Sequence, residues 1–278
     1  MAGQVCAQVE HDSSYAHSNA NNMKIPYIGI TDFSAAAQVQ AMLAILSSSK
    51  VQRRLHVGVM MSFKTLHDKA TKWAPIFPPK GSLASIFSAD HVMNCLHFAD
   101  YEDQPNLAAS LDQAVAYCGP RLRAIQLDMI WPDPVELQTF RAGKGQNLEI
   151  ILQIGKNAME ACQNSEELIS KKLELYSGSL DYVLLDKSMG QGKGMDAVGL
   201  LPLARRLTAD HPRIQLAAAG GLGPDSVELI RPLLLEFPQL SMDAQGKLRP
   251  SGNAMDPVDW EFAGTYLRRA VQLIKDCQ

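Results

Sequence analysis

The chain has 278 residues, of which 46% are hydrophobic and 20% charged, so it is long enough to bury one large α/β core. Its 26 Lys and Arg residues against 29 Asp and Glu give a formal net charge of −3, which argues against a general nucleic-acid or membrane-surface binder. Five scattered cysteines without metal-binding spacing predict reduced thiols and no zinc site. We therefore expect a soluble, cytoplasmic protein.

Apolar runs alternate with helical patterns after a polar N-terminal segment. Residues 1–22 are predicted to be a flexible tail, and residues 23–278 to form one domain. The runs are rich in Ile, Leu, Val and Met without strict alternation, as in strands buried on both faces. The predicted strands are Ile25–Thr31, Leu55–Met61, Met93–Phe98, Arg123–Asp128, Leu148–Ile154, Tyr182–Asp186, Ile214–Ala219 and Leu240–Asp243.

The segments between these strands have helical length and apolar spacings of three and four residues. The predicted helices are Ser34–Ser49, Ser82–Ser88, Leu107–Tyr117, Asp133–Arg141, Ser165–Tyr176, Asp196–Ala209, Asp225–Phe237 and Asp256–Lys275, the last with Asp256 as its cap and Pro257 in its first turn. Eight strand–helix units predict a closed (β/α)8 TIM barrel. The first strand is not followed by the Gly-x-Gly-x-x-Gly pattern of an open dinucleotide-binding sheet.

One connection is longer than the rest. About thirty residues, 61–91, separate the second and third predicted strands, and they include Trp73, Phe77 and the cluster from Pro75 to Pro79. Such a loop can close over an active site as a lid, or it can pack its aromatic residues onto the barrel. The sequence leaves both interpretations open.

Three consecutive late strands end in glycine-rich loops, where barrel enzymes place their active sites. These loops are Asp186-Lys-Ser-Met-Gly-Gln-Gly-Lys-Gly194, Ala219-Gly-Gly-Leu-Gly-Pro-Asp225 and Asp243-Ala-Gln-Gly-Lys-Leu-Arg249. Glycine lets backbone N–H groups approach an anion, and a helix N-terminus adds partial positive charge at the same point. The loops therefore predict a site for a phosphorylated small molecule.

Short motifs along the whole barrel resemble the phosphoribosylanthranilate isomerase family of tryptophan biosynthesis. The strand-six and strand-seven motifs are the most specific. The matching segments are Ile28-Gly-Ile-Thr31, Ser62-Phe-Lys64, Ile125-Gln-Leu-Asp128, Leu184-Leu-Asp186 with Gly190, Gly192 and Gly194, Ala219-Gly-Gly-Leu222 with Pro224 and Val227, and the positions of Asp243 and Asp256.

The resemblance implies a ribulose-phosphate-binding type of barrel and an Amadori rearrangement, in which Asp186 would be the general acid. The family's general base is a cysteine at the position of Ile28, and an aliphatic side chain cannot accept a proton. Asp32 or Asp128 is the candidate replacement, Asp32 on the argument that it shares the inward direction of Ile28. The alternatives are that Asp32 caps the following helix and that Asp128 is a cap or forms a salt bridge.

The resemblance also implies a set of binding residues. Lys64 replaces an arginine that contacts the substrate's carboxylate, and Lys64, Gln126 and Arg249 are the candidate substrate contacts. The candidate phosphate ligands are Gly192, Gly220, Gly221, Gln245 and Gly246. Lys64 and Arg249 could instead face solvent. Lys187 should point away from the barrel axis if Asp186 points inward. His97 ends the third strand and could face the barrel mouth, but a lone histidine beside Cys95 and Phe98 is more often a packed core residue.

These observations favour an isomerase-like enzyme acting on a phosphorylated, phosphoribosyl-type small molecule, with altered chemistry or substrate. A non-catalytic barrel that binds a phosphorylated metabolite is the alternative, and an aldolase-type lyase is a third. We expect no metal, no organic cofactor, no nucleic-acid partner and no membrane partner. The non-phosphate part of the ligand and the oligomeric state stay open.

Overall fold

The computed structural model describes residues 24–102, 105–187 and 194–278 and shows a closed ring of eight parallel strands. Each strand pairs with its neighbour in sequence, and β8 pairs with β1, so the predicted (β/α)8 barrel is confirmed. The predicted tail, residues 1–22, lies outside the described residues. The strands are β1 (Tyr27–Thr31), β2 (Arg54–Ser62), β3 (Met93–Ala99), β4 (Ala124–Asp128), β5 (Glu149–Gly155), β6 (Tyr182–Asp186), β7 (Gln215–Ala219) and β8 (Ser241–Ala244).

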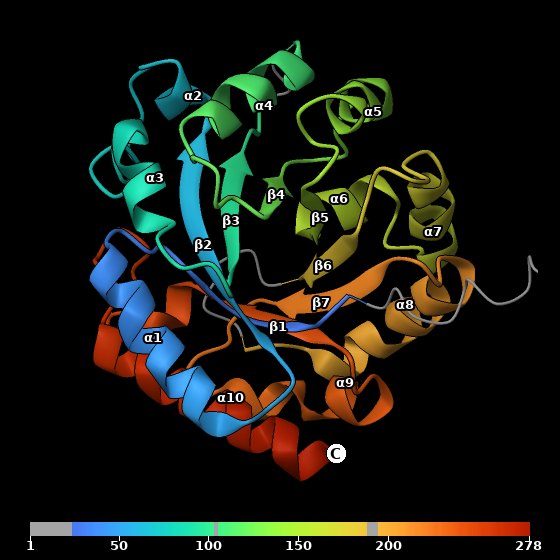
Figure 1. The fold of residues 1–278 in the computed structure, drawn as a ribbon. Coiled ribbons are helices and arrows are strands. Elements are labelled where there is room, and N and C mark those ends of the chain that lie inside the picture. Colours follow the sequence, from blue (N-terminus) through green and yellow to red (C-terminus); the bar gives the residue numbers. More distant parts are fainter. Residues whose placement is uncertain (1–23, 103–104, 188–193) are drawn as a thin grey trace, which may run out of the picture.

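Helices surround the strands, and α1 lies along α10 on one side of the barrel (Figure 1). The helices are α1 (Ala36–Ser49), α2 (Phe63–Leu66), α3 (Leu83–Ile86), α4 (Leu107–Ala116), α5 (Pro134–Ala142), α6 (Lys156–Ala161), α7 (Glu166–Glu174), α8 (Ala197–Asp210), α9 (Arg231–Glu236) and α10 (Trp260–Cys277), with 3-10 turns η2 (Lys80–Ser82), η3 (Val227–Ile230) and η4 (Gly246–Leu248). In the described ranges, none of these helices has the length and apolarity needed to cross a bilayer.

Two predicted helices differ from the helices in the structure. The segment predicted as one helix, Asp225–Phe237, is the four-residue turn η3 followed by α9. Pro232 has no N–H to donate within a continuous helix, and it is tolerated here because it falls in the first turn of α9. The predicted second helix, Ser82–Ser88, shrinks to α3 preceded by η2.

The cap of the last helix is also different. Asp259, and not Asp256, caps α10, and its Oδ1 accepts hydrogen bonds from the N–H groups of Glu261 and Phe262 at 2.9 and 3.0 Å. The carbonyl of Asp256 accepts a hydrogen bond from Arg249 Nε at 2.6 Å, which holds this segment outside the helix.

Side chains on the two faces of the strands form separate apolar clusters. The outer cluster packs strand residues such as Ile28 and Ile30 against helix residues such as Val39. The inner cluster fills the barrel axis with Tyr27, Met93, Cys95, Ala124, Ile151, Tyr182, Leu184, Ala217 and Ala219. Ile28 therefore faces the helices, and the argument that Asp32 shares an inward direction with it was wrong.

The N-terminal end of the barrel is closed by a polar group below the inner cluster. Arg54 Nη2 lies 2.7 Å from Glu149 Oε2 and donates a hydrogen bond to the hydroxyl of Tyr182 at 3.0 Å. Tyr27 stacks on His56 with ring centroids 4.8 Å apart. These contacts leave the C-terminal end as the end of the barrel where polar side chains can meet a ligand.

The long connection after β2 packs part of itself onto the barrel. The half-buried rings of Trp73 and Phe77 stack at 6.0 Å, and Lys80 donates a hydrogen bond to the carbonyl of Leu66 at 3.0 Å. The buried Leu66 of this connection belongs to the outer cluster, and the packing of Trp73 and Phe77 onto the barrel stays a prediction. Closure of the loop as a lid stays a prediction.

The cap of α10 can be tested directly. Asp259→Ala should lower the free energy of unfolding by about 1 kcal/mol, because two N–H groups lose their acceptor. Asp256→Ala is the matched control, since its carbonyl contact with Arg249 is retained, and it should change stability by less than about 0.5 kcal/mol. Urea unfolding of both variants makes the comparison. A larger loss for Asp256→Ala would mean that the helix begins earlier.

Candidate functional site

Polar side chains occupy the inside of the barrel from the middle of the strands to their C-terminal ends. Most of them lie between apolar neighbours that face the helices. The inward polar residues are Thr31 from β1, His56 from β2, His97 from β3, Gln126 and Asp128 from β4, Gln153 from β5, Asp186 from β6 and Asp243 from β8. We call the open end of this region, around Asp128, Gln153 and Asp186, the mouth.

Five of these side chains form a continuous polar ladder from β3 to β6, comprising Asp128, His97, Gln126, Gln153 and Asp186. Its links are contacts between Asp128 Oδ2 and His97 Nε2 at 3.5 Å and between His97 Nδ1 and Gln126 Nε2 at 3.2 Å. Gln126 then donates to Gln153 Oε1 at 3.0 Å, and Gln153 donates to Asp186 Oδ2 at 3.5 Å. The ladder joins the two half-buried carboxylates of the mouth, which the sequence proposed as acid and base.

The ladder changes the interpretation of two predicted residues. His97 was expected to be packed core, but its ring lies inside the barrel against Asp128. Burial disfavours its charged form, yet the hydrogen bond and charge of Asp128, with the carboxylates of Asp243 and Asp32, raise the pKa of His97. Gln126 is fully buried, so it holds the ladder together beneath the mouth. This placement favours a positioning role over direct substrate contact.

Asp243 lies deeper in the barrel. Its Oδ2 accepts a hydrogen bond from the hydroxyl of Thr31 at 3.0 Å, and its Oδ1 lies 3.7 Å from Nδ1 of His56. Burial raises the pKa of Asp243 to about 7, and the charges of other carboxylates act in the same direction. The charge of His97 and the hydrogen bond from Thr31 act in the opposite direction. Burial also lowers the pKa of His56 to about 3, so His56 is neutral. The sequence identified Asp243 as part of a motif but not as a titrating group of the site.

Two glycines make room for this buried pair. A Cβ atom at Gly29 would lie 2.3 Å from Asp243 Oδ1, and one at Gly58 would lie 2.4 Å from Thr31 Oγ1. Real Cβ atoms do not approach other atoms so closely. The carboxylate of Asp243 therefore occupies the space that an inward side chain on β1 would fill.

Asp32 and Arg249 form a buried ion pair beside the mouth. Arg249 Nη2 lies 2.6 Å from Asp32 Oδ2, and Gln245 Nε2 donates to the same carboxylate at 3.1 Å. Arg249 also donates from Nη1 to the carbonyl of Gln245 at 3.0 Å, and its side chain is 1% exposed. Ala35 stands at the N-cap of α1, so the cap role for Asp32 was wrong. These contacts favour structural roles for Asp32 and Arg249.

The loops after β2 and β3 meet at the rim of the mouth. Lys64 forms an ion pair with Glu102, and its side chain is 39% exposed. Tyr101 donates a hydrogen bond to Asp128, and burial together with the charges of Asp128 and Asp186 raises its pKa. Lys64 is thus at the rim, where a ligand carboxylate could reach it, and Tyr101 is a rim residue that the sequence did not suggest.

The predicted phosphate loops lie after β7 and β8. Gly220 and Gly221 adopt φ angles of 100° and 69°, a region that glycine enters readily. A Cβ at Gly223 would lie 2.6 Å from Cβ of Lys247, so the two loops pack closely, while Gly246 has open space around it. Because η3 is a 3-10 turn and α9 is short, the expected helix charge behind Gly220 is weaker than predicted. Gly192 lies outside the described residues.

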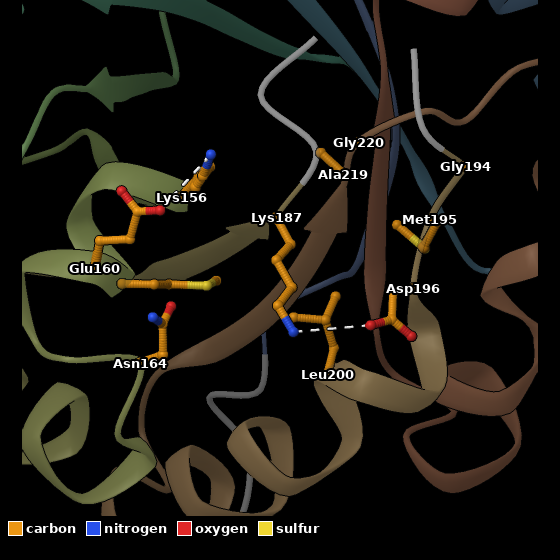
Figure 2. A pocket seen from close by; sticks show the side chains of 11 residues that line it. Lys156, Glu160, Asn164, Lys187, Gly194, Met195, Asp196, Leu200, Ala219 and Gly220 are labelled. Atoms are coloured by element: carbon orange, nitrogen blue, oxygen red, sulfur yellow. Dashed lines mark ion pairs between the residues drawn. The ribbon is translucent and has the colours of Figure 1, made fainter. Parts of the chain in front are cut away.

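A cavity of about 340 Å³ lies between α6 and the start of α8, beside the ends of β6 and β7, and Gly220 is among the residues that line it (Figure 2). Lys187 points into it and lies 3.7 Å from Asp196, as expected for a side chain directed away from the barrel axis. Lys156 lies 3.7 Å from Glu160, and both lysines are more than 40% exposed. Because both ammonium groups are paired and solvated, the mouth is the stronger candidate for a catalytic site.

A local sequence pattern marks the inward residues that the sequence analysis did not propose. His56, Gln153 and Asp243 are single polar residues between two apolar neighbours in buried strands, which points them at the barrel axis. In the described ranges, no three His, Cys, Asp or Glu side chains come close enough together to hold a metal ion.

Comparison with known proteins shows likeness in fold. No protein-family model and no curated protein matches the chain. Among solved structures it is similar to phosphoribosyl anthranilate isomerase in complex with reduced 1-(o-carboxyphenylamino)-1-deoxyribulose 5-phosphate, with a TM-score of 0.53 and 15% identity over 88% of this chain and 98% of that chain. Phosphonopyruvate hydrolase is more distant, with a TM-score of 0.45 and 12% identity over 79% of this chain and 75% of that chain. An endo-beta-1,3-glucanase from Amycolatopsis mediterranei has a TM-score of 0.45 and 11% identity over 89% of this chain and 100% of that chain. At these identities the likeness shows the barrel alone.

The pH dependence of stability tests the burial of Asp243. Its pKa is higher in the folded chain than in the unfolded chain, so wild-type stability should fall as pH rises from about 4 to about 7. Asp243→Asn removes this titration and should become the more stable protein at neutral pH, by up to about 4 kcal/mol. Urea unfolding across this range, with the exposed Asp225→Asn as control, measures the difference. A difference that stays constant with pH would contradict the account.

The close approach at Gly29 predicts a specific coupling. Gly29→Ala should destabilise the fold by about 1–3 kcal/mol, because its methyl group overlaps Asp243 Oδ1. Combined with Asp243→Ala, the same substitution should cost about 1 kcal/mol less. Gly81→Ala, where a Cβ meets nothing within 4 Å, is the control. Additive effects in the double-mutant cycle would show that the two positions do not contact each other.

Proposed function

We propose that the barrel is an enzyme that moves protons in the isomerisation of a phosphorylated, phosphoribosyl-type small molecule. Asp186 is the general acid, and a second carboxylate of the candidate site is the base. The loops after β7 and β8 hold the phosphate. The proposal includes no cofactor, and every proton that the acid and the base move returns to the substrate or to the group that gave it.

The polar ladder is the observation that carries this proposal. A barrel interior is normally filled by apolar side chains, and buried carboxylates are unfavourable unless they are paired. Here Asp128 and Asp186 are the two ends of the polar ladder, and Asp243 lies beneath them. Carboxylates in environments that move their pKa values apart are what acid–base catalysis uses.

The phosphate part of the proposal is supported by backbone geometry. Gly220 and Gly221 have positive φ angles, and a β-carbon at Gly246 would meet nothing within 4 Å. Among the turn and loop hydrogen bonds between described residues, none is donated by the N–H of Gly221 or Gly246. Such N–H groups can bind phosphate oxygens.

Thermal unfolding with a panel of phosphorylated metabolites tests the proposal. The panel includes inorganic phosphate, ribose 5-phosphate and the reduced anthranilate deoxyribulose phosphate. A ligand at a hundred times its Kd should stabilise the fold by about 2.7 kcal/mol, a clear rise in Tm.

A pair of glycine variants provides the control for this panel. Gly221→Asp should abolish the shift by placing a carboxylate against the phosphate, whereas Gly178→Asp should retain it. Both positions have positive φ, 69° and 81°, so the two variants share the backbone strain and the added charge. Gly178 precedes β6 at the opposite end of the barrel. No shift with any phosphorylated compound, in folded protein, would refute the phosphate site.

A further inference from the structure

We infer that the cavity between α6 and the start of α8 is a binding site for a small zwitterion, a free α-amino acid with an aliphatic side chain. The inference goes beyond the proposed function and does not depend on it, because the site takes no part in proton transfer. It follows from the charges that line the cavity, from the way these charges are paired, and from the apolar residues beside them.

The charged side chains of the cavity form two ion pairs. Lys156 and Glu160 lie one turn apart on α6, and Lys187 at the end of β6 faces Asp196 at the start of α8 (Figure 2). The lining therefore carries two ammonium and two carboxylate groups and has no net charge. A phosphate dianion would meet two like charges here, whereas a ligand with one positive and one negative group matches the lining.

Both ion pairs are open to a ligand. In each pair the lysine nitrogen lies 3.7 Å from the nearest carboxylate oxygen, which is beyond hydrogen-bond distance. The four side chains are between 43% and 59% exposed, and neither ammonium group donates a hydrogen bond to another described residue. Exposed ion pairs contribute little to stability, so exchanging them for contacts with a ligand costs little.

The carboxylate of Asp196 is held in place by the helix that it caps. Its Oδ1 accepts a hydrogen bond from the N–H of Gly199 at 2.9 Å, and its Oδ2 is the oxygen nearest to Lys187. The ammonium and carboxylate groups of an α-amino acid are joined to the same carbon atom, so they can contact Oδ2 and the Lys187 ammonium group together. Because one of the two partners is already fixed, less conformational freedom is lost on binding.

Apolar side chains complete the lining of the cavity. Met159, Met195, Leu200 and Ala219 belong to it, and each is at most 8% exposed. Methionine side chains adapt their shape to a ligand, and burying an aliphatic group against them is favourable. The volume of about 340 Å³ lies at the lower end of the range for small-molecule sites. These features favour an aliphatic amino acid over an inorganic ion.

Calorimetric titration of the full chain with four probes tests the inference. L-Leucine should bind. L-Leucinamide lacks the carboxylate and isocaproate lacks the ammonium group, so each should bind at least about 10-fold more weakly, because a hydrogen bond to a charged group contributes a factor of this size. Inorganic phosphate is the fourth probe, and the charges of the lining predict that it does not bind in the cavity.

Two conservative variants locate the binding. Lys187→Gln and Asp196→Asn should each raise the Kd for L-leucine by at least about 10-fold. Asparagine keeps the side-chain oxygen that caps α8, so the fold is retained. Lys275→Gln and Asp276→Asn, at the end of α10 and outside the cavity lining, are the matched controls and should leave the Kd unchanged.

Three results would overturn the inference: L-leucine does not bind to the folded protein, isocaproate binds as tightly as L-leucine, or the Kd is unchanged in both variants. Phosphate binding that is lost in Lys187→Gln and kept in Gly221→Asp would make the cavity a phosphate site, and would contradict the phosphate loops of the proposed function as well. Binding of L-leucine as predicted, without a response to any phosphorylated compound, would support the inference and refute only the phosphate site of the proposed function.

Discussion

The absence of side chains at two inward positions, Gly29 and Gly58, is the constraint on which the rest of the site depends. A barrel axis is normally packed solid by side chains from the strands. Here the missing β-carbons let the carboxylate of Asp243 and the hydroxyl of Thr31 enter the axis and bind each other at 3.0 Å. Once a carboxylate lies inside the barrel, its neighbours must be polar or small, and the polar layer of His56, His97 and Gln126 follows from that requirement.

Each of the four carboxylates of the site has a different environment. Asp32 lies against the guanidinium of Arg249, Asp128 against Tyr101 and His97, and Asp186 against Gln153, whereas Asp243 is buried with one oxygen unpaired. Like charges in one cavity raise each other's pKa, and opposite charges or hydrogen bonds lower it. The polar ladder couples these effects, because His97 touches Asp128 and its charge also acts on Asp243. The arrangement distinguishes three carboxylates with hydrogen-bonding or charged partners from one that is buried, has an unpaired oxygen and has a raised pKa.

The sequence predicted the barrel from its eight apolar runs, and the period of two in strands put Asp186 and Lys187 on opposite faces. It misplaced the strand-one residue: a motif match put the base position at Ile28, and a shift of one residue exchanges the two faces of a strand. The ion pair of Asp32 with Arg249 joins residues 217 positions apart, which no local pattern could reveal. The caps of α1 and α10 and the break between η3 and α9 rest on local contacts that the apolar pattern of the sequence does not locate to the residue.

A crystal structure with ribose 5-phosphate bound would test the central claim most directly. The account predicts the phosphate against the backbone N–H groups of Gly220, Gly221 and Gly246, with the sugar carbons at the mouth, beside Asp186. Phosphate bound between Lys156 and Lys187, away from the N–H groups of Gly221 and Gly246 and with the mouth filled by water, would contradict it.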